Sequence, residues 1–119
     1  MGKYLSIGQM GKLNNLSVQT LRHYEKVGIL KPSYINESGA RFYTDEDFVR
    51  LQQILLLKYL GFSLEDIREM TINDTDYHLM QNALNLQLKL IDDKIEQMQL
   101  VKQAIQDTSR EISKNHTVN

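Results

Sequence analysis

The sequence contains no cysteine, only one proline and no long uninterrupted run of apolar residues. Without cysteine the chain forms no disulfide bond and no thiolate metal site, which fits an intracellular protein. No stretch approaches the roughly 18 apolar residues of a membrane-spanning helix, and the N-terminus has no apolar signal segment. We therefore expect a cytoplasmic protein without membrane contact. Its length of 119 residues suits one small domain with an additional element.

The residue patterns from which enzymes build active sites are also missing. The three histidines lie far apart in the sequence, without a carboxylate at a useful spacing. Asp92, Asp93 and Glu96 cluster in the sequence, but on a coiled-coil helix such a group is typically a solvated face. There is no glycine-rich phosphate loop and no serine nucleophile motif. The sequence predicts a protein that is not an enzyme and uses no cofactor or metal.

Charged residues nearly balance, at a net charge of −1, but they are unevenly distributed. Eight Lys and Arg against five Asp and Glu give residues 1–60 a charge of +3, whereas six against ten give residues 61–119 a charge of −4. A basic excess in one part of a chain is typical of a region that meets phosphate. At this size the excess is a weak signal by itself.

Short polar signatures mark where helices begin and end. A hydroxyl can accept a hydrogen bond from an unpaired N–H in the first turn of a helix. The hydroxyl residues in such positions are Ser6, Ser17, Thr44 and Ser63. Asn14-Asn15, Gly28 and Gly61 are typical of helix ends, and Pro32 prevents a helix from resuming. The sequence predicts helices that end at 14–15, run over 17–28, and span about 45–60 and 63–70.

Residues 34–43 interrupt this helical pattern. Two β-rich segments flank the glycine-containing turn at 36–39, which predicts a hairpin. Because side chains alternate along a strand, we expect Phe42 to point to the core and Arg41 and Tyr43 to face outward. Facing outward, the arginine and the tyrosine would suit contacts with phosphate.

The helix expected over 17–28 has an apolar face and a polar face. Val18, Leu21 and one edge of the Tyr24 ring are spaced to meet the core. The outward arc holds Gln19, Thr20, Arg22, His23 and Lys26. Such side chains can bind base edges and phosphates, Arg on guanine and Gln on adenine. For an isolated helix a merely solvated face is the simpler interpretation, but a short capped helix before it and a hairpin after it favour a winged helix-turn-helix that binds DNA.

The C-terminal part predicts one long helix over 77–112, preceded by polar residues at 71–76 and followed by a tail at 113–119. Its apolar residues recur at alternating steps of four and three, which is the heptad pattern of a coiled coil. The seam residues are Leu84, Leu88, Ile91, Ile95, Met98 and Ile105. Lys102 and Ser109 share this register, so the seam weakens toward the end. A lone helix cannot bury such a seam, and we expect dimerisation, with packing on the chain's own domain as the alternative.

Residues 4–70 resemble the DNA-binding domain of the MerR family of bacterial transcription regulators. The segments that carry the resemblance are 6–9, 17–25, 28–32, 37–43 and 60–67. The long helix at 77–112 matches as well, and the likeness is closest to the multidrug-responsive branch. The chain departs from a common family pattern at His23 and Ala40, where tyrosine is frequent.

The resemblance implies a homodimer joined by an antiparallel coiled coil and bound to an inverted repeat in promoter DNA. It implies that the protein bends and underwinds an overlong spacer, so that RNA polymerase is affected indirectly through the promoter. The implied DNA contacts are Arg22, His23, Tyr24, Arg41 and Tyr43. Multidrug-type members continue into a ligand-binding domain, whereas this chain ends at Asn119. We expect either the DNA-binding and dimerisation part of a longer protein or a short regulator whose effector the sequence does not identify.

The sequence thus predicts a mostly α-helical fold. A winged helix-turn-helix with a short hairpin wing occupies residues 1–70, and a long coiled-coil helix follows. The predicted function is a sequence-specific transcription regulator that binds double-stranded promoter DNA as a dimer and activates by distorting it. Two alternatives remain: a structural protein that bridges DNA, and an interaction module whose helix-turn-helix binds protein.

Overall fold

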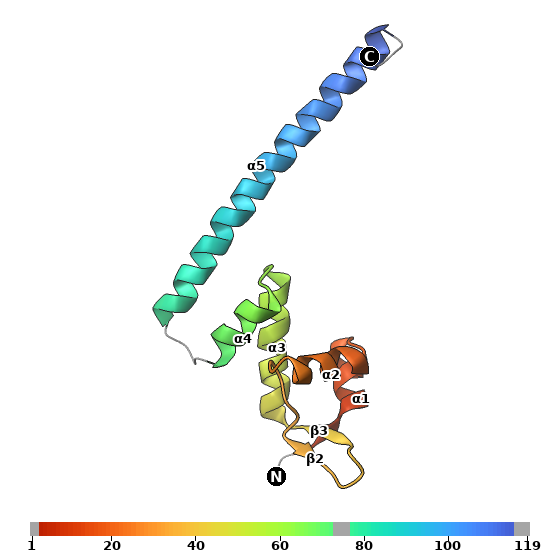
Figure 1. Cartoon of the computed structure of the whole chain (residues 1–119), viewed down its shortest axis with the longest axis vertical. Helices are drawn as coiled ribbons and strands as arrows, with labels where there is room; N and C mark the ends of the chain where they lie inside the picture. Colours follow the sequence, from red (N-terminus) through yellow and green to blue (C-terminus); the bar gives the residue numbers. More distant parts are fainter. Residues whose placement is uncertain (1–2, 73–76, 116–119) are drawn as a thin grey trace. The chain divides into compact units, whose positions relative to one another are not determined.

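The structure is a computed structural model and describes residues 3–72 and 77–115. It divides into two units, Met1–Asp76 and Tyr77–Asn119. The first contains four helices and a small sheet, and the second consists of one helix (Figure 1). We call the first the winged-helix unit and describe each unit by itself.

The winged-helix unit begins with helices α1 (Ile7–Asn14) and α2 (Val18–Lys26), joined by a tight turn. The predicted capping box at Ser6 forms, because the Gln9 N–H donates to Ser6 Oγ at 3.1 Å and the Ser6 N–H donates to Gln9 Oε1 at 2.9 Å. At the end of α1, Asn15 adopts a left-handed conformation with φ of 56°. Ser17 then caps α2, as predicted. These local signals place the two helices of the helix-turn-helix close to the predicted boundaries.

Three short strands form an antiparallel sheet in the order β1-β3-β2. Strands β2 (Tyr34–Ile35) and β3 (Arg41–Tyr43) make the predicted hairpin, with Tyr34 opposite Phe42. Asn36 Oδ1 holds the turn by accepting hydrogen bonds from the N–H groups of Ser38 at 3.1 Å and Ala40 at 2.8 Å. The third strand, β1 (Leu5–Ser6), was not predicted because two residues are too few for an alternating pattern.

The predicted orientation of the β3 side chains is wrong. Tyr43 is completely buried, whereas Phe42 is half-buried on the other face of the sheet. There the Phe42 ring lies beside Tyr4 and Tyr34, at centroid distances of 6.5 and 5.9 Å. Alternation itself holds, but a cluster of aromatic rings on the outer face shelters Phe42. The core side of the strand is therefore the side that carries Arg41 and Tyr43.

Helices α3 (Asp45–Tyr59) and α4 (Leu64–Ile72) complete the winged-helix unit. Thr44 caps α3, and its backbone N–H donates to Asp47 Oδ2 at 2.9 Å. Side chains from α1, α2, α3 and α4 and from the loop after α2 meet in the core. The fully or almost fully buried residues include Met10, Leu21, Ile29, Leu30, Leu51, Ile54 and Ile67. This core fixes α2 and the hairpin, which carry the predicted functional residues.

Helix α5 (Tyr77–Asn115) makes up the second unit as described. Its 39 residues correspond to roughly 58 Å at about 1.5 Å per residue. It continues three residues beyond the predicted end, so 113–115 are helical rather than a tail, while 116–119 lie outside the described residues. Of the predicted polar break at 71–76, positions 71–72 belong to α4 and 73–76 lie outside the described residues. No helix in the described part of the chain has the length and apolar character needed to cross a membrane.

Candidate nucleic-acid interface

The polar face of α2 is presented to solvent, as the sequence predicted. Gln19, Arg22, His23 and Lys26 are exposed, whereas Leu21 on the opposite face is fully buried. Within residues 3–72 and 77–115, neither Arg22 nor Lys26 takes part in an ion pair. The helix therefore offers hydrogen-bond donors and positive charge on a surface that its own unit does not occupy.

Thr20 has a local role in addition to the predicted one. Its N–H donates to Ser17 Oγ at 3.0 Å, and the two hydroxyl oxygens lie 2.9 Å apart. Thr20 is half-buried and stabilises the first turn of α2. A contact between Thr20 and DNA stays a prediction.

The two tyrosines among the predicted DNA contacts belong to the core. Tyr43 has no exposed surface, and Tyr24 is only 3% exposed. Burial raises the pKa of Tyr24 and, with a further contribution from Glu25, raises the pKa of Tyr43 to about 12. The outward orientation predicted for Tyr43 is therefore wrong, whereas Tyr24 lies in the core, as predicted for one edge of its ring. A contact between either tyrosine and DNA stays a prediction. The Tyr43 hydroxyl is buried without a hydrogen-bond partner among the described residues.

Arg41 links the wing to α2. Its Nε donates to Glu25 Oε1 at 2.5 Å, in a pair whose side chains are 30% and 24% exposed. Arg41 Nη1 also lies 3.5 Å from the Gly39 carbonyl oxygen, at the limit of a hydrogen bond. Arg41, which was predicted to face outward, is therefore only partly exposed. Glu25 had no predicted role, because a separation of 16 residues from Arg41 gives no periodic signal of contact.

Four charged side chains act electrostatically on the Tyr43 hydroxyl. Besides burial, Glu25 and Asp47 raise the pKa of Tyr43, and Arg41 and Arg22 lower it. These residues come from α2, β3 and α3. We call this group, with Tyr43 at its centre, the α2–wing junction. It places Arg22 of α2 and Arg41 of β3 in one electrostatic neighbourhood.

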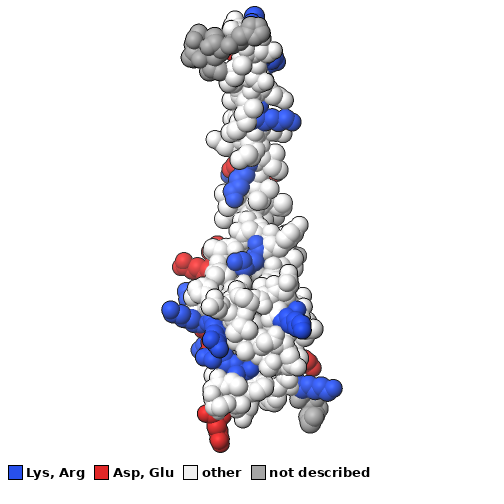
Figure 2. All heavy atoms as spheres, turned by 90° about the vertical axis from the view of Figure 1, so that its right-hand side faces the viewer, with Lys and Arg blue, Asp and Glu red and all other residues white. Residues whose placement is uncertain are grey.

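Figure 2 shows Lys and Arg side chains at several points on one face of the winged-helix unit, with Asp and Glu side chains also projecting from its edges. Over residues 1–60 as a whole the formal charge is +3. Among the described residues, no three His, Asp or Glu side chains are grouped as metal ligands would be.

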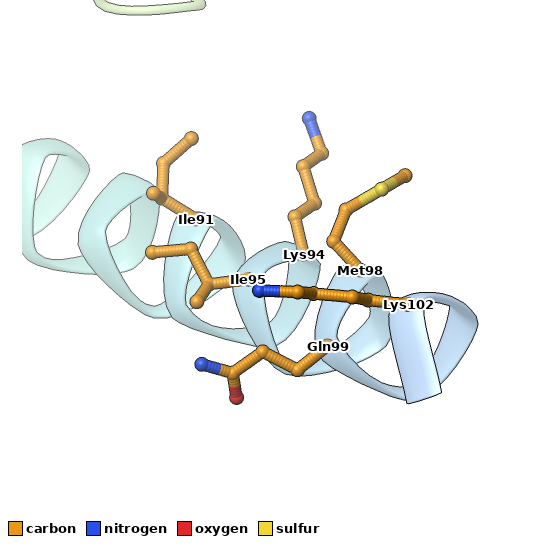
Figure 3. Close-up of a pocket in the computed structure, with 6 residues that line it drawn as sticks. All are labelled: Ile91, Lys94, Ile95, Met98, Gln99 and Lys102. Carbon is orange, nitrogen blue, oxygen red and sulfur yellow. The ribbon is translucent and has the colours of Figure 1, made fainter. Parts of the chain in front are cut away.

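The predicted coiled-coil seam forms an apolar strip on α5. Ile91, Ile95 and Met98 are 38%, 51% and 66% exposed and line a shallow groove. Figure 3 shows the side chain of Lys102 lying back along the helix toward Ile95. Of the remaining seam residues, Leu84 is half-buried, and Leu88 and Ile105 are exposed. The seam is thus unburied in the single chain, which leaves its predicted role in dimerisation open to test.

Comparison with known proteins identifies the relatives of this chain. Residues 5–72 match the family model described as MerR HTH family regulatory protein, and residues 48–108 match the model described as MerR, DNA binding. The chain is 34% identical over 95% of its length to the transcriptional activator Mta of Bacillus subtilis, of which it spans 43%. It is 30% identical over 87% of its length to the transcriptional regulator YfmP of the same species, of which it spans 89%. The chain is also 40% identical, over 56% of its length, to the multidrug-efflux transporter 1 regulator of B. subtilis, and it spans 24% of that protein.

Solved structures show the same fold. A MerR-family regulator from Bacillus cereus matches with a TM-score of 0.84 and 29% identity, covering 98% of this chain and 88% of that one. The N-terminal part of Mta, MtaN, matches with a TM-score of 0.78 and 35% identity, covering 87% of this chain and 96% of that one. EcmrR in a complex with DNA matches with a TM-score of 0.70 and 30% identity, covering 90% of this chain and 40% of that one. The fold, the exposed polar helix beside a wing, and these matches agree, and the chain belongs to the MerR family of helix-turn-helix regulatory proteins.

Proposed function

We propose that this chain is a sequence-specific DNA-binding transcription regulator that acts on an inverted repeat in a promoter. The observation that carries the proposal is the exposed polar face of α2, with Gln19, Arg22, His23 and Lys26 outward and its apolar face in the core. In a helix-turn-helix the second helix enters the major groove and reads base edges. The wing beside it brings Arg41 to the neighbouring backbone. The cytoplasmic location expected from the sequence follows from this role and stays a prediction.

The second element of the proposal is a homodimer formed through α5. In the described chain none of the residues of α5 is fully buried, and the seam is exposed over two heptads. Each Å² of apolar surface that an interface removes from water stabilises it by about 25 cal/mol. A two-fold symmetric pair would hold two recognition helices at a fixed separation, which suits an inverted repeat.

The third element is activation by distortion of the promoter spacer. It is supported by the family membership and by Mta, which is named a transcriptional activator. RNA polymerase would then be affected through the shape of the DNA.

Selection of bound duplexes from a random double-stranded library tests the proposal. We expect the purified chain to enrich a two-fold symmetric sequence. A structural protein that bridges DNA would retain duplexes without a consensus, and a protein-binding module would retain none; either result would refute the proposal. The Arg22→Ala variant serves as a control for recognition by α2, because it removes the longest exposed side chain of this face and leaves the fold unchanged.

The activation step needs its own assay. The selected operator is placed in the spacer of a test promoter, in a normal and a lengthened version, and transcription is measured in vitro. We expect the protein to raise transcription only from the lengthened spacer. Repression of both versions would show that the protein regulates without realigning the promoter.

A further inference from the structure

An acidic side chain on the helix proposed to meet DNA requires an explanation. Glu25 lies on α2 in the last turn before Lys26, and its side chain is 24% exposed. A carboxylate near phosphates lowers affinity by repulsion unless it is neutralised. Glu25 is neutralised by Arg41, whose Nε lies 2.5 Å from Glu25 Oε1. The position of this carboxylate thus depends on a residue of the wing.

The geometry of the pair leaves part of the arginine available. A guanidinium group has five N–H donors in a planar fork. The described contacts of Arg41 use Nε and, at 3.5 Å, Nη1 toward the Gly39 carbonyl. Arg41 remains 30% exposed, so the anchored fork still has surface toward solvent. A guanidinium held in one orientation loses less conformational entropy when it binds phosphate.

The pair also sits at the α2–wing junction. Arg41 and Tyr43 are on the same side of β3 because side chains alternate along a strand. Both Glu25 and Arg41 act electrostatically on the Tyr43 hydroxyl, which is fully buried. The ion pair therefore lies at the border between the core and the proposed DNA surface, where it joins two elements that are separate in sequence.

We propose that Glu25 is a positioning residue that holds the Arg41 guanidinium in the orientation in which the wing contacts the DNA backbone. The same pair fixes the wing to α2, so that recognition helix and wing approach DNA as one surface. This inference rests on the proposed DNA-binding function.

Substitutions at the pair separate positioning from repulsion. Glu25→Ala is expected to weaken operator binding roughly five- to tenfold although it removes a negative charge, because charge-assisted hydrogen bonds are among the stronger ones. Glu25→Gln keeps an oxygen that can accept from Arg41 Nε and should stay within about threefold of wild type. Glu37→Ala is the matched control, since Glu37 is an exposed acid in the wing turn; its affinity should be unchanged or slightly higher. If Glu25→Ala binds as tightly as wild type or more tightly, Glu25 only repels DNA and the inference is wrong.

The salt dependence adds a readout that loss of structure would not mimic. Arg41→Ala should lower the slope of log affinity against log salt by about one for each protomer. Glu25→Ala should lose affinity with the slope unchanged, because the phosphate contact persists in a poorer orientation. In the double variant the loss should equal that of Arg41→Ala alone, and full additivity of the two losses would contradict the inference.

A measurement without DNA distinguishes this inference from the function on which it rests. In the ¹⁵N NMR spectrum of the free protein, the Arg41 Nε–H should exchange slowly in wild type and Glu25→Gln and rapidly in Glu25→Ala. Equal exchange in all three would overturn the inference even if DNA binding is intact. If no variant binds DNA while exchange follows the expected order, the proposed function fails and the ion pair stands. Circular dichroism of each variant checks that it is folded. If Glu25→Ala is not folded, Glu25→Gln still tests the inference, because rapid exchange of the Arg41 Nε–H in this variant would contradict it.

Discussion

Arg22 is the residue whose loss should most affect sequence recognition. It is exposed one turn into α2 and is in no ion pair among the residues that the structure describes. We expect Arg22→Ala to cost roughly 1–3 kcal/mol per half-site and to relax the base preference, because an arginine fork on guanine discriminates bases. Footprinting and competition with base-substituted operators measure both effects. Lys89→Ala, which removes one exposed positive charge from α5, is the control.

Arg41→Ala should act differently, by weakening binding to all sequences alike. A wing arginine is expected to contact the backbone, which carries no direct base information. A change in base preference with Arg41→Ala but not with Arg22→Ala would show that the two roles are exchanged.

The Tyr43 hydroxyl should be dispensable for stability. It is buried and without a hydrogen-bond partner in the described structure, so it bears a desolvation cost without compensation. We expect Tyr43→Phe to leave the free energy of unfolding at pH 7 unchanged or to raise it by up to about 1 kcal/mol. Chemical denaturation measures this. A clear loss of stability would mean that the hydroxyl is bonded, for example to a buried water molecule.

The raised pKa of Tyr43 adds a pH dependence. Its pKa is about 12 in the folded chain against 10.0 for an ordinary tyrosine, so the unfolded chain releases this proton first as pH rises. Ionisation of Tyr43 therefore leaves the stability of the folded chain unaffected below pH 10 and lowers it as pH rises toward 12. Wild type should lose more stability over this range than Tyr43→Phe, and parallel curves for the two would contradict the assignment.

The orientations and partners of single residues were the features that the sequence predicted least well. Alternation along β3 was predicted correctly, but the inward side was assigned to Phe42 instead of Tyr43. The structure buries Tyr43 and shelters Phe42 beside Tyr4 and Tyr34. Such a cluster requires β1 to pair with β3, and a two-residue strand leaves no sequence pattern. Glu25 was missed for a related reason, since its partner lies in another element.

At the scale of elements, the turn between α1 and α2 depends on Gly11. A Cβ atom built there would lie 2.6 Å from the carbonyl oxygen of Leu16, and the Leu16 N–H donates to the Gly11 carbonyl at 2.8 Å. We expect Gly11→Ala to destabilise the fold by about 2 kcal/mol, since backbone must shift, even though alanine favours helices.

Gly8 provides the matched control on the same helix. A Cβ there would have its nearest neighbour, Ser6 Oγ, at 3.9 Å, which is ordinary contact. Gly8→Ala should be neutral or stabilising by up to about 1 kcal/mol. Urea unfolding of both variants checks the pair. Equal effects of the two substitutions would show that the turn adapts without cost.

The elements themselves were largely predictable because their ends depend on local chemistry. Hydroxyl caps precede four helices, and all four accept the expected backbone N–H: Ser6, Ser17, Thr44 and Ser63. Asn15 and Gly28 supply the positive φ angles at the ends of α1 and α2. These interactions span three or four residues, so one sequence suffices to find them.

At the scale of the whole molecule, α5 should determine the oligomeric state. Ile91 lies in the middle of the seam, 38% exposed in the single chain. In a symmetric dimer Ile91→Asp would bury two unpaired carboxylates, which costs several kcal/mol. We expect a folded monomer with much lower operator affinity, because one recognition helix alone lacks the effective concentration that linkage provides.

Sedimentation of this variant against Gln97→Asp, which adds a carboxylate outside the seam, tests the assignment. A dimer of Ile91→Asp that persists at low micromolar concentration would place the contact on another face of α5. The leading candidate is then the face with Ala83, Leu86 and Leu90, where the two leucines are 60% and 47% exposed. Pairing between chains is the part of the account that one sequence specifies least, because both faces are apolar.

Operator affinity as a function of salt, for an inverted repeat and for a single half-site, tests most directly whether the protein is a dimeric regulator that reads promoter DNA. If each protomer neutralises about four phosphates, log affinity for the repeat should fall with log salt at a slope near −7. The half-site should bind far more weakly and with roughly half the slope, because one protomer contacts it. Affinity that is flat between low and moderate salt, or equal for the repeat and the half-site, would contradict a dimeric regulator that reads promoter DNA.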